Sequence, residues 1–149
     1  MALEDETKLA VANIIKKMLK SPVIDFSNRV MHDQTGQPIM EWDGIFICCN
    51  KVFLCESKHK MTEEKIATLV KRLGEFPNKL EVTKDFKFKK LLGMECIGVA
   101  CATLFPEELR QKCVDELGLV VAYRRCRIVS KYPQKYMDVN GIIITNISL

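Results

Sequence analysis

The sequence has few of the features that mark membrane, secreted or zinc-finger proteins. No run of about eighteen apolar residues occurs, and the first residues, MALEDETK, lack a basic region followed by an apolar one. We therefore expect no membrane span and no secretory signal, and an intracellular, soluble chain or a fragment of a longer one. Internal repeats and low-complexity linkers are absent as well, and 48% of the 149 residues are hydrophobic, so we expect residues 1–149 to form one domain with a single core.

The seven cysteines form neither a CxxC pair nor a Cys/His cluster, so they do not have the spacing of a tetrahedral zinc site. Their number is odd, which argues against a complete disulfide framework. Five of them lie in apolar, strand-like runs: Cys48, Cys49, Cys55, Cys96 and Cys101. We interpret these as reduced, buried thiols, and we expect a reducing compartment.

The net charge of +4 is modest, but basic and aromatic residues are interleaved in two stretches. These are residues 84–90, KDFKFKK, and residues 123–136, YRRCRIVSKYPQKY. Such stretches could contact phosphates and stack on bases. A solvated basic loop and an ordinary exposed strand would have the same composition, so each stretch taken alone leaves both interpretations open.

The first part of the chain has the pattern of a helix followed by a strand. Apolar residues recur with helical spacing between Leu3 and Leu19, and acidic residues occupy the first turn, where the helix dipole favours them. Residues 23–30, VIDFSNRV, alternate as a strand, and DQTGQP at 33–38 is a turn. We therefore predict an antiparallel hairpin between this strand and the next.

Two further strands and a second helix follow. We predict strands at 39–49 and 52–58, joined by a hairpin at Asn50 and Lys51. Thr62 is the expected N-cap of a helix that ends near Gly74. A short helical turn is expected around Phe86, Phe88, Leu91 and Leu92.

The last part of the chain begins with an unbroken apolar run. CIGVACATL at 96–104 is typical of a strand buried on both faces. Pro106 opens a helix that Gly118 caps, and a strand is predicted at 119–123. The tail, GIIITNISL, predicts an edge strand or a surface for association. This order of elements predicts a mixed α/β fold, in which the helix after the third strand allows a parallel crossover.

Charged residues interrupt the apolar run EWDGIFICCNKVFLCESKHK at 41–60. If each strand is regular, Glu41 and Asp43 share one face of the first strand, and Glu56 and Lys58 share one face of the second. A carboxylate among apolar residues costs several kcal/mol of desolvation unless a cation or hydrogen bonds compensate it. The pattern therefore favours a metal-binding acidic cluster with a lysine beside it.

With Asp43 on one strand and Glu56-Ser57-Lys58 on the next, the chain resembles the PD-(D/E)XK, or restriction-endonuclease-like, nuclease superfamily. The segments EWDG and ESK are similar to elements of its archaeal Holliday-junction-resolvase-like and Mrr-like branches. The likeness covers about residues 3–105, and 106–149 would be variable. It implies a mixed central sheet with an αβββαβ core in a three-layer α/β/α arrangement. Trp42 stands where the signature has proline, a variation common in the superfamily.

The resemblance implies a DNA endonuclease that hydrolyses phosphodiester bonds with Mg²⁺, for which Mn²⁺ would substitute. Asp43, Glu56 and the main-chain carbonyl of Ser57 would hold the ion, because Mg²⁺ prefers oxygen ligands. Lys58 would orient the attacking water or stabilise the phosphate. The alternatives are a nuclease-like module that binds nucleic acid or protein without turnover, and a structural domain in which Asp43, Glu56 and Lys58 form a salt-bridge network.

Several further residues are candidate helpers. Glu41 could add a ligand, or could be a solvent-facing acid paired with Lys58 or Lys60. In resolvase-like relatives an acid on the first helix approaches the metal, a role that Glu6 or Glu4 could fill, although acids also suit a helix N-terminus.

Lys60 and Lys65 could contact a phosphate or simply be solvated. Strand alternation places the His59 side chain on the face opposite Lys58. We expect DNA as the partner and no membrane. Relatives that cut both strands commonly dimerise, so the apolar tail GIIITNISL could mediate a homodimer. Similar domains in some eukaryotic effector and mobile-element proteins allow a nuclear location.

Overall fold

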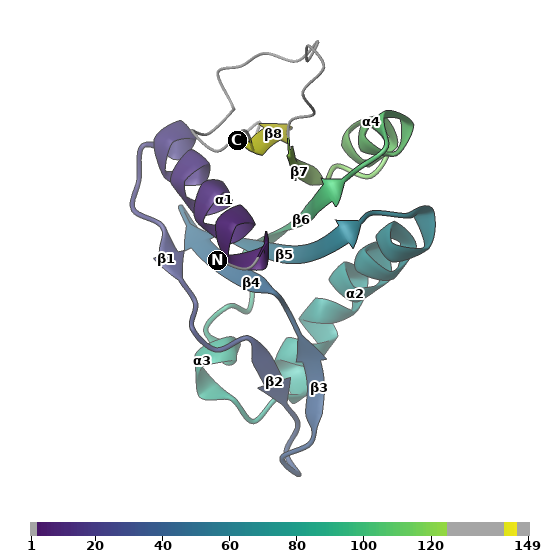
Figure 1. The fold of residues 1–149 in the computed structure, drawn as a ribbon. Coiled ribbons are helices and arrows are strands. Elements are labelled where there is room, and N and C mark those ends of the chain that lie inside the picture. The colour runs from purple at the N-terminus through teal and green to yellow at the C-terminus, as the bar shows by residue number, and fades with distance from the viewer. Residues whose placement is uncertain (1–2, 125–141, 146–149) are drawn as a thin grey trace.

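The computed structural model describes residues 3–124 and 142–145, and these form a mixed sheet with helices on both faces (Figure 1). Strands in the six-stranded sheet lie in the order β1-β4-β5-β6-β7-β8. The strands β5 and β6 are parallel, as are β6 and β7, and the other neighbours are antiparallel. The mixed α/β class is therefore confirmed. No helix among the described residues is long and apolar enough to cross a membrane.

The strands of this sheet are β1 (Ile24–Asp25), β4 (Gly44–Cys48), β5 (Lys51–Lys60), β6 (Glu95–Leu104), β7 (Val120–Arg124) and β8 (Ile142–Thr145). A separate two-stranded sheet pairs β2 (Val30–His32) with β3 (Pro38–Glu41). The helices are α1 (Leu3–Leu19), α2 (Glu63–Val82), α3 (Phe86–Lys89) and α4 (Glu107–Asp115).

Two apolar clusters lie on opposite faces of the sheet. Helix α1 packs Val11 and Ile15 against one face, where Phe53 and Cys55 of β5 are buried. The other cluster includes side chains of both α2 and α4, packed with Leu54 of β5. Successive residues of β5 therefore point into different clusters, as strand alternation requires.

The strand predicted at 23–30 does not form. Only Ile24 and Asp25 pair with the main sheet, and Val30 belongs to the β2–β3 hairpin, which turns at the predicted DQTGQP segment. The Phe26 amide still donates to the Ile45 carbonyl of β4 at 2.9 Å, so pairing with the main sheet ends at this residue. The Phe26 ring packs on Phe88 of α3, with the centroids 4.9 Å apart.

The strand predicted at 39–49 is also interrupted, at Trp42 and Asp43. Trp42 is buried against Phe76 of α2, with ring centroids 6.2 Å apart, so this position leaves the ladder to fill the core. The next turn contains Cys49 and Asn50, whose φ angles are 53° and 64°. The hairpin therefore lies one residue earlier than the Asn50–Lys51 position predicted.

Helix α2 begins as predicted, with the Thr62 side chain accepting a hydrogen bond from the Lys65 amide at 3.2 Å. It does not end near Gly74 but continues to Val82, through Pro77. Proline inside a helix costs about 3 kcal/mol. Burial of Phe76 and Leu80, which continue the apolar stripe of the first turns, offsets that cost.

The remaining predictions agree better with the structure. Strand β6 is the predicted buried strand, α3 is the expected short helical turn, and α2 provides the parallel crossover from β5 to β6. Residues 142–145 of the tail form an edge strand. Among the thiols interpreted as buried, Cys49 is in fact exposed and Cys96 only partly buried, because Cys49 lies in the turn. The basic stretch beyond Arg124 lies outside the described residues.

Candidate functional site

Asp43 lies where β4 begins, and hydrogen bonds attach it to β5. Its amide donates to the carbonyl of Cys55 at 3.1 Å, and its Oδ2 accepts from the amide of Ser57 at 2.7 Å. The last ladder pair of β4 and β5 is Gly44 with Cys55. The Asp43 carboxylate therefore accepts the hydrogen bond that a main-chain carbonyl would accept if the ladder continued. This bond holds the carboxylate beside the middle of β5.

Glu56 and Lys58 occupy alternate positions of β5 on the face that α2 covers. Lys58 Nζ lies 3.8 Å from Glu56 Oε2, and the Glu56 side chain is only 12% exposed. Burial raises the pKa of Glu56, and the negative charge of Asp43 raises it further, whereas Arg72 and Lys58 act in the opposite direction. The predicted acids and lysine are thus close enough to influence one another.

Arg72 of α2 is a component of this site that the sequence reasoning missed. Its Nη1 donates to Glu56 Oε1 at 2.5 Å, and its Nη2 donates to the main-chain carbonyl of Glu41. The guanidinium also lies over the Trp42 ring, 4.2 Å from the centroid. A signal was present, because Arg72 follows Leu69 by three residues and precedes Phe76 by four, which places a cation on the buried stripe of the helix.

Lys8 of α1 was missed as well. It is 7% exposed, and its side chain passes so close to Gly44 that a Cβ atom there would lie 2.8 Å from Lys8 Cδ. Its positive charge lowers the pKa of Cys55, a group whose pKa burial raises. Lys8 precedes Val11 by three residues and Ile15 by seven, so helical spacing again places a cation on a buried face.

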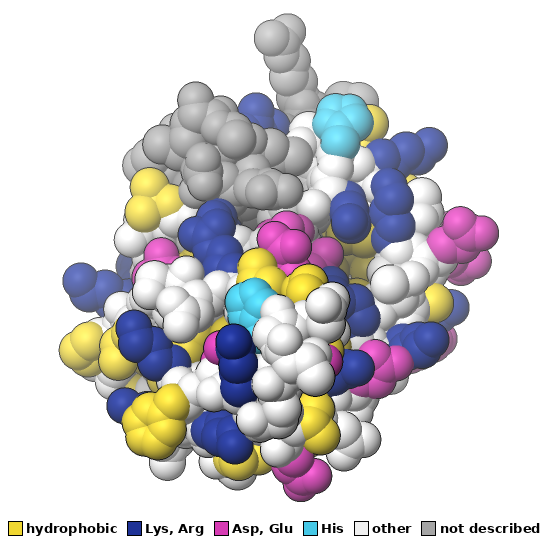
Figure 2. Space-filling view, turned by 90° about the horizontal axis from the view of Figure 1, so that it is seen from below, with side chains coloured by type: hydrophobic (Ala, Val, Ile, Leu, Met, Phe, Trp, Pro, Cys, Tyr) yellow, Lys and Arg dark blue, Asp and Glu magenta, His cyan; other side chains and the backbone are white. Residues whose placement is uncertain are grey.

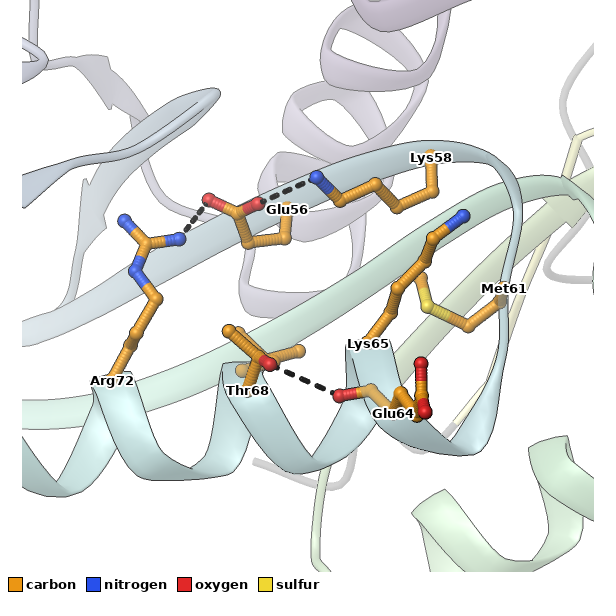
Figure 3. Close-up of a pocket in the computed structure, with 8 residues that line it drawn as sticks. Glu56, Lys58, Met61, Glu64, Lys65, Thr68 and Arg72 are labelled. Atoms are coloured by element: carbon orange, nitrogen blue, oxygen red, sulfur yellow. Dashed lines mark hydrogen bonds and ion pairs between the residues drawn. The ribbon is translucent and has the colours of Figure 1, made fainter.

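The face of the molecule in Figure 2 has acidic side chains near its centre and basic side chains on both sides of them. A hollow of about 320 Å³ is bounded by the end of β5 and the first turns of α2. Its lining residues are Glu56, Lys58, Met61, Glu64, Lys65, Thr68, Leu69 and Arg72. Figure 3 shows that Arg72 and Lys58 approach Glu56 from opposite sides. The hollow thus carries three cations and two acids.

The predicted helpers are only partly brought to this site. Glu41 ends β3 with an exposed side chain, and only its main-chain carbonyl contacts Arg72, because the break at Trp42 removes it from the phase of Asp43. Lys65 lines the hollow, but its Nζ donates to the carbonyl of Lys60 at 2.8 Å. Lys60 itself is exposed and lies outside this lining.

The predictions for Glu4, Glu6 and His59 have different outcomes. Glu4 and Glu6 lie in the first turns of α1, but their side chains fall outside the described part of the molecule. His59 is exposed near the end of β5 and does not line the hollow.

Within residues 3–124 and 142–145, no three His, Cys, Asp or Glu side chains gather as a metal-binding group. Asp43 and Glu56 therefore stand as a pair of carboxylates. On the neighbouring strand β6, burial raises the pKa of Cys101, the ladder partner of Ser57, to about 12, and the charges of Asp43 and Glu56 add to the rise. This thiol stays protonated near neutral pH, so cysteine chemistry at Cys101 is disfavoured.

The main-chain carbonyl of Ser57 can be placed by strand geometry. In an antiparallel ladder, the amide and carbonyl of one residue point toward the same neighbouring strand. The Ser57 amide bonds to Asp43, so the Ser57 carbonyl also points to the β4 side, where the ladder has ended. Asp43 and this carbonyl consequently offer oxygen atoms on the same side of β5.

Comparisons with protein-family models, curated proteins and solved structures found no match to this chain.

Proposed function

We propose that the chain is a Mg²⁺-dependent nuclease that hydrolyses phosphodiester bonds of DNA. The observation that carries this proposal is the hydrogen bond of Asp43 to Ser57, the residue between Glu56 and Lys58, which both line an open hollow. Two carboxylates and a lysine on adjacent strands are the residue types that metal-assisted phosphodiester hydrolysis requires. The same residue types on adjacent strands are what the resemblance to restriction-endonuclease-like nucleases implies, which supports the proposal.

The topology also supports this proposal. Within the main sheet, the chain runs α1, β1, β4, β5, α2, β6, which is the order of an αβββαβ core. The β2–β3 hairpin is then an insertion between the first two strands of that core. Asp43 comes from the start of the second strand and Glu56 from the third.

The available donors suit Mg²⁺, a hard cation that prefers oxygen ligands and retains several waters. Asp43, Glu56 and the Ser57 carbonyl would hold it, and the ion would neutralise charge on the phosphoryl oxygens and lower the pKa of a bound water. Arg72 already bonds Glu56 Oε1, so it would have to share or release that oxygen. A released guanidinium could form bidentate bonds with phosphate.

The exposure of Lys58 supports a role at the reacting phosphate. Its side chain is 42% exposed toward the hollow, while its Nζ stays 3.8 Å from Glu56. A protonated amine at this position would orient the attacking water or donate a hydrogen bond to a phosphoryl oxygen as negative charge develops there. Lys65 and Arg72, which line the same hollow, add positive charge that favours a phosphate backbone.

Cleavage assays test the proposal directly. Plasmid and single-stranded DNA would be incubated with Mg²⁺ or Mn²⁺, and wild type compared with Asp43→Asn, Lys58→Met and Glu81→Gln. We expect wild type and the exposed-site control Glu81→Gln to cut, and a loss of about 10²-fold or more in the other two variants, the size of effect that removing one charge-stabilising group has in other enzymes. The proposal fails if wild type cuts neither substrate, or if Asp43→Asn cuts as fast as wild type.

A module that binds nucleic acid without turnover is the second candidate, and the ion pairs of Glu56 favour it. Arg72 and Lys58 already compensate this carboxylate, so the acid pair does not depend on a metal for its charge balance. This candidate predicts salt-sensitive DNA binding without Mg²⁺ and no cleavage under any metal.

A further inference from the structure

A short helix, α3, presents one phenylalanine to solvent and another to the core. Phe88 is 0% exposed and packs on Phe26, whereas Phe86 is 72% exposed. Leu91, just after the helix, is 2% exposed and anchors the same segment. The exposure of Phe86 therefore follows from a fixed orientation of the helix.

Hydrogen bonds hold the start of this helix against the β2–β3 hairpin. Asp85 Oδ2 accepts from the His32 amide at 2.8 Å and lies 3.1 Å from His32 Nδ1. The buried hydroxyl of Thr83 donates to the His32 carbonyl at 2.6 Å. Asp85 is the one acid among residues 82–94, and it is already engaged by His32.

The residues around Phe86 are strongly basic. Lys84, Lys87, Lys89 and Lys90 are all exposed, and Lys90 Nζ lies 5.1 Å from the centroid of the Phe86 ring. We call the four lysines and Phe86 the α3 patch. The patch combines an exposed aromatic ring with four positive charges. Asp85 does not cancel these charges, because its carboxylate is engaged by His32.

We propose that the α3 patch binds single-stranded nucleic acid, with a base stacked on Phe86 and backbone phosphates on the lysines. Stacking needs an unpaired base, which a duplex does not offer, and an aromatic platform in a basic surface is the common solution for single strands. A lipid surface is the competing occupant, because Val82 and Leu92 on either side of α3 are also exposed, by 53% and 46%. The four exposed lysines within residues 84–90 and the outward ring of Phe86 favour a nucleic acid.

The inference deepens the proposed function and rests on it for its link to cleavage. The hollow is lined by α2 residues up to Arg72, and the α3 patch follows the end of α2 at Val82. At 1.5 Å per residue, the ten residue steps from Arg72 to Val82 correspond to about 15 Å along the helix axis. A single strand that extends from the hollow along α2 would reach the patch after several nucleotides.

Binding without metal isolates this patch from catalysis. Fluorescence anisotropy with a labelled thymidine oligonucleotide in EDTA would compare wild type with Phe86→Ala and Phe86→Trp. Loss of one stacked base, worth about 1–3 kcal/mol, predicts roughly 5- to 150-fold weaker binding for Phe86→Ala. Phe86→Trp should bind at least as well as wild type, and its emission should be quenched by the oligonucleotide. Both variants should fold, since the side chain is exposed.

The lysines are tested by the salt dependence of affinity. Lys87→Gln with Lys90→Gln should lower the slope of log affinity against log salt by about 1.4, or 0.7 for each lost phosphate contact. The matched control is Lys16→Gln with Lys17→Gln, which removes two exposed charges from the far end of α1 and should leave the slope unchanged.

The inference is overturned if Phe86→Ala binds the oligonucleotide as tightly as wild type, or if both double variants change the salt slope equally. It is also overturned if Phe86→Ala loses binding to phosphatidylserine vesicles but not to the oligonucleotide. Oligonucleotide binding that depends on Phe86, together with cleavage indifferent to Asp43, would sustain the patch and reject the proposed nuclease. Cleavage that depends on Asp43, together with oligonucleotide binding that does not depend on Phe86, would reject the patch and leave the proposed nuclease in place.

Discussion

Arg72 is the side chain that most directly compensates Glu56. Arg72→Ala would leave a carboxylate that is 12% exposed with Lys58, 3.8 Å away, as its one remaining ion-pair partner among the described residues. Loss of one member of a fully buried ion pair costs about 3–5 kcal/mol, and since Arg72 is 23% exposed we expect about 2 kcal/mol here. Urea unfolding measures this loss.

Two comparisons show whether the loss comes from the unpaired acid. The neighbouring Lys71→Ala, whose side chain is 77% exposed, should change stability by no more than about 0.5 kcal/mol. Adding Glu56→Gln to Arg72→Ala should restore most of the lost stability, because the buried charge is then gone. Equal stability of Arg72→Ala and Lys71→Ala would show that the pair contributes nothing.

Glu56 should also make stability depend on pH. Burial raises its pKa above the ordinary value of 4.5, and Asp43 adds to the rise. The folded state therefore keeps the Glu56 proton to a higher pH than the unfolded state, and the stability that this gives is present below about pH 4.5 and lost as pH rises through the folded pKa. Urea unfolding between pH 4 and 7 should show wild type losing stability relative to Glu56→Gln. A relative gain would mean that Arg72 outweighs burial.

At the scale of single elements, the continuation of α2 past Gly74 can be tested with glycine substitutions. Nothing lies within 4 Å of a Cβ at Gly74, and the position is inside the helix, so Gly74→Ala should raise stability by about 0.5–1 kcal/mol. Gly118→Ala is the contrasting variant, because Gly118 has a φ of 64° and should be destabilised by a side chain. Destabilisation by Gly74→Ala in thermal melts would indicate a helix that ends at this glycine.

Elements defined by local pattern were predicted well from the sequence. Helix α1 follows from apolar spacing and β6 from an unbroken apolar run, and neither needs distant information. The errors arose where distant contacts decide the structure. The Phe26 ring packs on Phe88 of α3 where pairing with the main sheet ends, and the strand predicted at 39–49 is interrupted where Trp42 packs on Phe76 of α2.

The candidate site divides in the same way. Asp43, Glu56 and Lys58 could be identified because charges in apolar strands are conspicuous. Arg72 and Lys8 lie on helices, where charged residues are ordinary, and only their positions on buried stripes distinguish them. Which strand residue each cation contacts depends on how the helices pack on the sheet. The spacing of residues along one helix does not predict this packing.

At the scale of the whole molecule, the sheet lies between two helices, and each of them places a cation against the strands that carry the candidate site. Lys8 of α1 lies beside Gly44 and Cys55 on one face, and Arg72 of α2 bonds Glu56 on the other. Asp43 joins the two faces through its bond to Ser57. Because Arg72 and Lys58 already compensate Glu56, we expect folding not to require a metal, and a bound ion should act as an additional ligand.

Mg²⁺ should therefore raise the melting temperature of wild type without being needed for folding. A ligand that binds only the folded state at 100 times its dissociation constant adds about 2.7 kcal/mol. For a chain of 149 residues this corresponds to roughly 5–11 °C. Asp43→Asn should lose most of the shift, and Glu81→Gln, which changes an exposed acid far along α2, should keep it. Equal shifts in wild type and Asp43→Asn, measured by calorimetry at constant ionic strength, would place any ion away from Asp43 and reject the proposed metal site.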